Sequence, residues 1–456
     1  MQNFSLPLQL EGDRIHRIAA FLQKYIDQYG YKLIETPIAE STDVVAYPTE
    51  NQPHHPFIFE QDEANFALRT DFTSAAVRWY IKQKRQDVAR WQFSGPVFRV
   101  DAKNHYQCYS AGVELFGMSD PAAEAEIISL AALGLNALGV NHWSLRIGHA
   151  GLTQQLFSHF ELESSIRSFI WQHRRQLREI SIGKEWLRQQ LGLYVLSERY
   201  VEESGGESLS DVEAQLFWDV IMGKLTAEQL AAAQISRYLH AERIMRSIQW
   251  DSINAALDFL GEWLLIHDAP PIALSAIEKH VGDDEIAWQM VIDWRAVLTL
   301  MDAYGVPPEH ILIQTDATGF EDYYTGLVFE LCSPDGQRLA KGGRYNDFAR
   351  FLGYAQTLPL VGFAYDLELI ERVLPPGAHK TPSPIHLITG RHTDVAAARW
   401  ATALRQRGIA AEVVNPAQAR GENPLFVRED GRVQLGQQFY SPEQIDLLVI
   451  TLNGLP

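Results

Sequence analysis

Apolar residues recur every three to four positions near the start of the chain. One side of a predicted helix over residues 12–29 carries Ile15, Ile18, Ala19, Leu22 and Ile26. Another helix is predicted from Asp120 to about residue 138. Its start is marked by an aspartate at the N-cap followed by a proline in the first turn.

Shorter apolar segments predict strands. Residues 31–40 (YKLIETPIAE) predict one strand, in which Pro37 takes an edge or bulge position because proline has no amide hydrogen to donate. Further strands are predicted over 57–72 (as a hairpin), 144–152, 311–316, 322–343 (turning at Ser333–Gly336) and at the start of 359–374, which ends as a helix.

The order of these elements predicts several domains, as the length of 456 residues also does. A core over 1–151 and 305–375 is interrupted by a mainly helical insert over 152–304. The proline-rich segment 376–384 predicts a linker, and 385–456 read as strand, helix and strand in a small α/β domain.

Composition indicates an ordered protein, with 46% hydrophobic and 21% charged residues. The first residues lack a basic leader with an apolar run, and no segment is long and apolar enough to predict a membrane span. Cys108 and Cys332 lie far apart, which disfavours a disulfide framework or a zinc site. We therefore expect a cytoplasmic protein.

Charge disfavours a large nucleic-acid surface, because the formal net charge is -18. The stretch 166–190 is the exception, since it is locally basic with interleaved aromatic residues. It fits either a solvated amphipathic helix face or a local RNA contact.

Five ordered segments resemble the class II aminoacyl-tRNA synthetases, and specifically the histidyl branch. They are YKLIETPIAE, LRTDFTSAAVRWY (68–80), SGPVFRVDAKNHYQCYSAGVELFG (94–117), DYYTGLVFE with KGGRYNDFARFLG, and VGFAYDLELIERVL. The resemblance implies an α/β (α+β) fold: a mixed, mainly antiparallel sheet with flanking helices, the helical insert, and a C-terminal domain resembling a shortened anticodon-binding domain.

The same resemblance implies site residues. Pro37 matches a dimer-interface proline, and the remnant histidine and ATP pocket comprises Asp71, Thr73, Arg99, Glu114, Tyr323, Tyr324, Gly342, Gly343 and Arg344. Each also has a structural interpretation. The tyrosines fit core aromatics, the glycines fit a tight turn, and Arg99 fits a remnant held by Glu114. His149 fits a structural histidine better than a ligand.

Departures from the synthetase pattern fall on the groups that stabilise the transition state of amino-acid activation. Leu369 stands where the third-motif arginine belongs, Asp366 replaces a glycine, and Gly319 stands in place of the histidyl-specific arginine. Two missing cations remove ~5 to 8 kcal/mol of stabilisation. The carboxylates of Glu321 and Asp366 add repulsion toward ATP phosphates. No catalytic residue, metal or cofactor is therefore expected.

The segment RIGHAGLTQQLF (146–157) resembles the family of non-catalytic regulatory subunits of ATP phosphoribosyltransferase. That resemblance implies a homodimer within a hetero-oligomer, the short-form catalytic subunit as partner, histidine as effector, and no tRNA. The regulator would activate the partner in the first step of histidine biosynthesis and confer feedback inhibition. A divergent histidyl-tRNA synthetase and a free-standing histidine or adenylate sensor are the alternatives.

Overall fold

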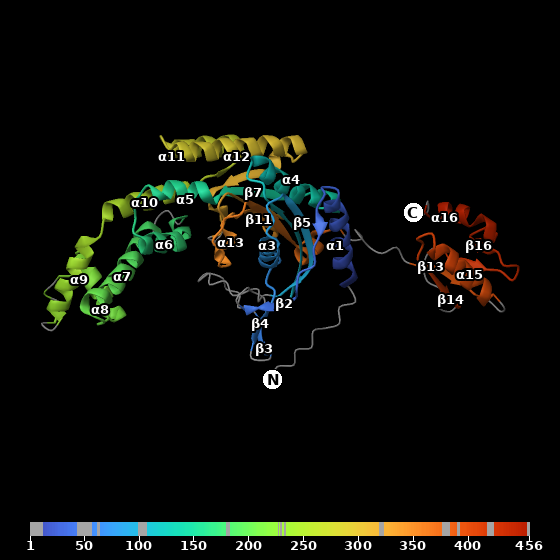
Figure 1. Cartoon of the computed structure of the whole chain (residues 1–456), viewed down its shortest axis with the longest axis horizontal. Coiled ribbons are helices and arrows are strands. Elements are labelled where there is room, and N and C mark those ends of the chain that lie inside the picture. Colours follow the sequence, from blue (N-terminus) through green and yellow to red (C-terminus); the bar gives the residue numbers. More distant parts are fainter. Residues whose placement is uncertain are drawn as a thin grey trace. The chain divides into compact units, whose positions relative to one another are not determined.

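The computed structural model describes residues 12–42, 57–61, 64–98, 107–178, 183–226, 228, 230–231, 234–318, 323–375, 384–389, 393–416 and 424–453. The chain divides into two compact units, Met1–Pro376 and Gly377–Pro456. The first unit holds a nine-stranded and a three-stranded sheet, and the second holds a five-stranded sheet. The strands of both units are drawn in Figure 1.

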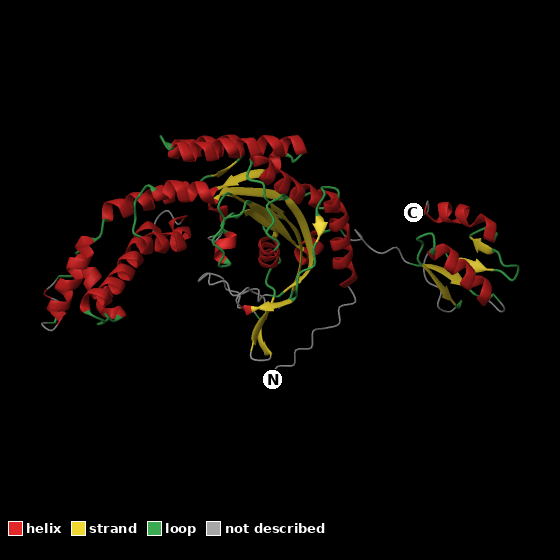
Figure 2. Ribbon diagram, in the orientation of Figure 1, coloured by secondary structure: helices red, strands yellow, loops and turns green. Residues whose placement is uncertain are grey.

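A nine-stranded sheet forms the centre of the first unit (Figure 2). Its order is β1 (Lys32–Leu33), β5 (Ala89–Val97), β6 (Cys108–Phe116), β12 (Leu360–Asp366), β11 (Arg338–Arg344), β10 (Leu327–Cys332), β7 (Ser144–His149), β9 (Ile311–Gln314) and β8 (His267–Asp268). Neighbours are antiparallel except for the pairs β1–β5 and β7–β9. The sheet is therefore mixed and mainly antiparallel, as predicted.

Helices α1 (Gly12–Asp27), α4 (Pro121–Leu138) and α12 (Glu285–Tyr304) pack in layers on one face of this sheet (Figure 1). The predicted start of α4 is confirmed, because the Asp120 carboxylate accepts from the Ala122 amide at 3.0 Å. Among the described helices, α4 alone has the length and apolar composition of a membrane span. It is a core helix, since 67% of it is buried.

The opposite face of the sheet is the front face, where the predicted pocket lies. Helix α3 (Thr73–Lys82) begins there and α14 (Leu367–Val373) follows β12 directly. The first unit also holds a small sheet and three short helices: β2 (Ala39–Ser41), β4 (Ala64–Leu68), β3 (Ile58–Gln61), α13 (Phe348–Phe351), η4 (Pro308–His310) and η5 (Thr315–Thr318).

The insert is almost entirely helical, as expected (Figure 2). Its helices are α5 (Ala150–Ser158), α6 (Ser164–His173), η1 (Arg174–Arg178), α7 (Gly183–Ser204), α8 (Asp211–Ile221), α9 (Ile235–Ser247), α10 (Trp250–Trp263), α11 (Pro270–Val281) and α12. The two-residue strand β8 was not predicted. It is too short to show a periodic pattern and joins the sheet only at its edge.

The second unit has a five-stranded sheet ordered β14 (Ala411–Val414), β13 (Ile385–Ile388), β15 (Leu425–Val427), β16 (Val433–Leu435) and β17 (Gln438–Tyr440). Helices α15 (Asp394–Arg405) and α16 (Ile445–Asn453) share one hydrophobic core with it. This matches the predicted small C-terminal α/β domain. The predicted linker lies almost entirely outside the described residues.

One strand prediction was wrong. Residues 31–40 form two short strands, β1 and β2, which belong to different sheets. Pro37 lies between them, where it has no amide hydrogen to offer a ladder. The hairpin over 57–72 is confirmed as β3 and β4.

Candidate functional site

The candidate site is built on the front face around Glu114 of β6. In the strand register Glu114 lies directly opposite Gly362, and Gly362 lies opposite Gly343. A Cβ atom at Gly362 would lie 2.3 Å from Glu114 Oε2. The two glycines therefore leave room on the sheet for the carboxyl group and for side chains above it.

Glu114 is 1% exposed and accepts two hydrogen bonds from outside its strand. Thr73 Oγ1 donates to Oε1 at 2.6 Å, and the Tyr345 hydroxyl donates to Oε2. Burial raises the pKa of Glu114 to about 7, although both hydroxyl donors act in the opposite direction. Close to neutral pH the carboxyl group can therefore be present in either protonation state.

Asp71 and Thr73 flank the first turn of α3 next to this carboxyl group. Asp71 Oδ1 accepts from the Ser74 amide at 2.9 Å, and Oδ2 accepts from Thr70 Oγ1 at 3.1 Å. The charge of Asp71 contributes to the raised pKa of Glu114. Asp71 thus lies near Glu114, and its carboxylate also binds an amide in the first turn of α3.

Tyr323 and Tyr324 form one wall, with ring centroids 4.7 Å apart. Tyr345 lies edge-on to both, at 5.9 and 5.7 Å. Tyr324 is buried and its ring lies 5.5 Å from Lys341 Nζ, whereas Tyr323 is partly exposed. The two tyrosines are therefore both core aromatics and neighbours of the site.

Gly342 and Gly343 lie within β11, so the turn interpretation of these glycines was wrong. A Cβ atom at Gly343 would lie 2.4 Å from the Leu327 carbonyl oxygen and 2.8 Å from the Tyr324 ring. At Gly342 it would lie 2.3 Å from the Gly362 carbonyl oxygen. Both glycines permit close packing across the strands.

Arg344, at the end of β11, forms a buried ion pair with Glu124 of α4. Its Nε and Nη2 atoms each lie 2.5 Å from a Glu124 carboxylate oxygen, and Nη1 donates to the Met118 carbonyl at 2.9 Å. Arg344 is 5% exposed. Its guanidinium group therefore contacts the helix layer rather than the Glu114 carboxyl group.

The start of α14 carries acidic groups where the third synthetase motif has an arginine. Asp366 caps the helix, because its Oδ1 accepts from the Leu369 amide at 3.0 Å. Glu368 Oε1 accepts from the Tyr109 amide at 2.6 Å, and burial raises the pKa of Glu368 to about 7. This corner offers carboxyl groups, not a guanidinium group, to a ligand.

His149 is a structural residue at the corner between β7 and α5. Its Nδ1 accepts from the Leu152 amide at 3.0 Å, so it caps α5 in the neutral form. Burial lowers the pKa of His149 to about 4. The following Gly151 is required there, since a Cβ atom would lie 2.3 Å from the Thr325 carbonyl oxygen.

Arg99, Gly319 and Glu321 lie outside the described residues. Within the described part of the chain, no group of three or more His, Cys, Asp or Glu side chains could hold a metal ion. Pro37 is exposed, as are its neighbours Leu33 (47%) and Ile38 (50%).

Sequence reasoning missed Tyr345 and Glu368 as members of the site. Tyr345 follows the quoted Gly-Gly-Arg segment directly, so its position could have suggested a role. Its bond to Glu114 spans 231 positions in sequence and needs the strand register. Glu368 lies next to Leu369, but its raised pKa depends on burial, which the sequence does not give.

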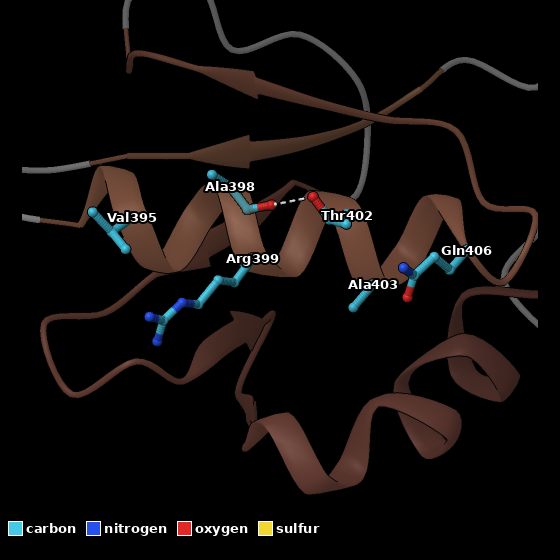
Figure 3. A pocket seen from close by; sticks show the side chains of 6 residues that line it. All are labelled: Val395, Ala398, Arg399, Thr402, Ala403 and Gln406. Atoms are coloured by element: carbon cyan, nitrogen blue, oxygen red, sulfur yellow. Dashed lines mark hydrogen bonds between the residues drawn. The ribbon is translucent and has the colours of Figure 1, made fainter.

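A shallow hollow on the second unit does not have the features of a site. Figure 3 shows its lining residues along one helix, α15: Val395, Ala398, Arg399, Thr402, Ala403 and Gln406. A ligand site needs walls from more than one element. The front-face residues described above come from several elements, among them β6, α3 and β11.

Comparison with known proteins identifies the family. The family model described as histidyl-tRNA synthetase matches residues 4–192 and 221–370 of the chain. The chain belongs to the histidyl-tRNA synthetase family. The match spans most of the core and part of the insert. It therefore includes every front-face residue described above.

Relatives of this histidyl-tRNA synthetase family member carry two different names. A histidine–tRNA ligase from Methanocaldococcus jannaschii is 25% identical over 357 residues, covering 76% of this chain and 69% of that protein. An ATP phosphoribosyltransferase regulatory subunit from Cyanothece sp. is 26% identical over 419 residues, covering 88% and 85%. A regulatory subunit from Bacillus velezensis is 23% identical, covering 78% and 76%.

Solved structures agree with the class II synthetase-like fold. A regulatory subunit/histidyl-tRNA synthetase from Bacillus halodurans superposes with a TM-score of 0.64 at 19% identity, covering 92% of this chain and 94% of that one. Histidyl-tRNA synthetase from Nostoc sp. gives a TM-score of 0.65 at 16% identity, covering 99% and 100%. At these identities the likeness concerns the fold.

Proposed function

We propose that this family member is the non-catalytic regulatory subunit of ATP phosphoribosyltransferase, required for the activity of the short-form catalytic subunit and for its inhibition by histidine. The observation that carries the proposal is the start of α14. Leu369 stands at the place of the third-motif arginine, beside the carboxyl groups of Asp366 and Glu368. Relatives named as such regulatory subunits support it.

Adenylate formation places negative charge on phosphorus and needs preorganised cations. Carboxyl groups at the α14 corner oppose that charge. A family member with this corner can keep its fold and its amino-acid pocket without the chemistry. It then acts on a partner only by binding one of the partner's states better than another.

The same proposal places the effector in the front-face pocket. Asp71 offers a carboxylate to an α-amino group. Glu114 and Tyr345 offer groups that can hydrogen bond an imidazole, and Tyr323 and Tyr324 form an aromatic wall. Histidine is the amino acid whose functional groups fit this set.

We also propose a homodimer through the Pro37 region, since exposed apolar side chains surround Pro37. The C-terminal unit is proposed to be a shortened anticodon-binding domain without a tRNA role. We also propose four domain limits: the core at 1–151 and 305–375, the insert at 152–304, the linker at 376–384 and the C-terminal domain at 385–456.

A divergent histidyl-tRNA synthetase is the second candidate, favoured by the 25% identity to the ligase from M. jannaschii. Histidine-dependent exchange of pyrophosphate into ATP separates the two. We expect the purified protein to show no exchange above a no-enzyme control, because the α14 corner lacks its cation. Exchange that scales with protein concentration would favour the synthetase.

A further inference from the structure

Two aromatic side chains, Phe72 and Phe93, are stacked on each other next to the front-face site. Their ring centroids are 4.5 Å apart with an interplanar angle of 14°, and each residue is 3% exposed. Phe72 directly precedes Thr73, whose hydroxyl group donates to Glu114. We call this pair the aromatic stack, and it lies beside the proposed histidine site.

The strand register places the aromatic stack one step along the sheet from Glu114. Phe93 lies opposite Gly112, which comes two residues before Glu114 on the same face of β6. A Cβ atom at Gly112 would lie 2.8 Å from Phe93 Cζ, so the ring covers this glycine. Ala364, opposite Gly112 on β12, packs against the same cluster. Two residues of a strand span about 7 Å, which is the distance along β6 from Glu114 to the covered position.

In the other direction from Glu114 the front face is covered as well. Phe116 and Leu360 lie opposite each other one step further along β6 and β12, and both are buried in one cluster with Trp91. A ligand that contacts Glu114 therefore has an aromatic cluster on each side along the strands. The site is short in this direction.

Arg69 holds the aromatic stack in place. Its guanidinium carbon lies 4.3 Å from the centre of the Phe72 ring, and Arg69 is 6% exposed. Its Nε donates to the Pro96 carbonyl at 2.8 Å, and its Nη1 donates to the Thr36 carbonyl at 2.9 Å. Moving Phe72 aside would break the contact with this fixed cation and expose apolar ring surface. The closed arrangement is therefore the stable one.

An aminoacyl adenylate would need the space that the aromatic stack fills, because it carries its nucleotide on the carboxyl carbon of the amino acid. Leu369, at the start of α14, stands where the synthetases have a cation for ATP. A nucleotide joined to a histidine at Glu114 would extend toward this corner. Its path crosses the step formed by Gly112 and Ala364, and Asp366 follows one step further on β12. The aromatic stack covers the crossing.

We propose that Phe72 is a specificity-determining residue of the front-face site. Its ring closes the site beyond the carboxyl end of the bound amino acid, so the site takes free histidine and excludes a nucleotide or an adenylate joined to it. This inference rests on the proposed function, because it takes histidine as the ligand. It adds a steric reason for the loss of adenylate formation, independent of the missing cation.

The test compares histidine, histidine amide and histidine benzylamide by calorimetric titration of the full-length chain. The two amides differ only by the benzyl group beyond the carboxyl carbon. We expect the wild type to bind the small amide at least tenfold more tightly than the benzylamide. In Phe72→Ala the phenyl group of the ligand can fill the space left by the removed ring, and this ratio should fall by tenfold or more. The substitution removes no capping hydrogen bond from α3, since the Phe72 side chain makes none.

Phe157→Ala is the matched control, because Phe157 is also 3% exposed and contacts two other rings, but lies on α5 of the insert. It should keep the wild-type ratio. A second readout uses the unmodified protein and depends on no variant. The stable adenylate mimic 5′-O-(N-histidylsulfamoyl)adenosine should bind more weakly than histidine, and tighter binding of the mimic would contradict the proposal.

The outcomes separate this role of Phe72 from the proposed function. If the wild type binds both amides equally well, or if folded Phe72→Ala keeps the wild-type ratio, the role of Phe72 is wrong and the histidine site stands. If the unmodified chain binds no histidine, the proposed effector site is overturned, and this role of Phe72 with it.

Discussion

The buried position of Glu114 makes the stability of the protein depend on pH. In the unfolded chain its pKa returns to about 4.5, whereas burial raises the folded-state pKa to about 7. Between these values the folded protein binds more protons than the unfolded chain. The free energy of unfolding therefore falls as pH rises through this window.

The substitution Glu114→Gln removes this titration while keeping the size of the side chain. We expect the free energy of unfolding of the variant to depend less on pH between 4.5 and 7 than that of the wild type. The difference reaches about 3 kcal/mol at the upper end, from the 1.36 kcal/mol per pKa unit. Urea unfolding at several pH values measures it.

The exposed Glu309 provides the control, since Glu309→Gln makes the same change of side chain on the surface of the protein. Equal profiles for wild type and Glu114→Gln would mean that Glu114 is not desolvated as described. The family resemblance placed Thr73 in the same expected pocket as Glu114. Its burial and its bond to Tyr345 follow from the register of β6, β12 and β11, which the sequence does not give.

At the scale of elements, Arg344 joins the sheet to its helix layer. The ion pair with Glu124 connects β11 to α4, and both side chains are almost fully buried. Removing one partner leaves the other buried and charged. Arg344→Ala should therefore lower the free energy of unfolding by roughly 3–5 kcal/mol, measured by denaturant titration.

The double variant Arg344→Leu/Glu124→Leu should recover much of that loss, because neither charge is then left alone. Arg85→Ala, which breaks the exposed pair with Asp87, should change the free energy of unfolding little. A ligand role for Arg344 would show differently. Arg344→Ala would then weaken histidine binding without loss of stability.

The segment RIGHAGL forms the corner between β7 and α5. The segment resembles the regulatory subunits, and in the structure two of its residues have local roles: His149 caps α5, and Gly151 fits against Thr325. The predicted strand ends at His149, because this cap begins a helix at Ala150. The side-chain cap decides this boundary, and the apolar pattern does not mark it.

At the scale of the whole molecule, periodicity predicted α1, α4 and the helical character of the insert, because amphipathic helices repeat their pattern many times. It predicted no strand over 89–97 or 108–116, which form β5 and β6. It did not separate β1 from β2 or find β8, because strands of two or three residues carry no period. The pocket depends on contacts between residues far apart in the chain. Its composition was therefore available from the family resemblance rather than from spacing.

The charge of the molecule is also unevenly distributed. The formal net charge of residues 166–190 is +4. The formal net charge of the remaining residues is therefore -22, which gives the total of -18. The front-face site is the feature through which we propose that this chain binds an effector.

The central claim is that this chain regulates a transferase, and a steady-state assay tests it most directly. The reaction of ATP with phosphoribosyl pyrophosphate is followed with the short-form catalytic subunit alone, with this chain added, and with this chain and histidine. We predict that the chain raises turnover and that histidine then lowers it, each by roughly 5- to 150-fold for a typical coupling of 1–3 kcal/mol. Turnover that responds neither to this chain nor to histidine in its presence would contradict the account.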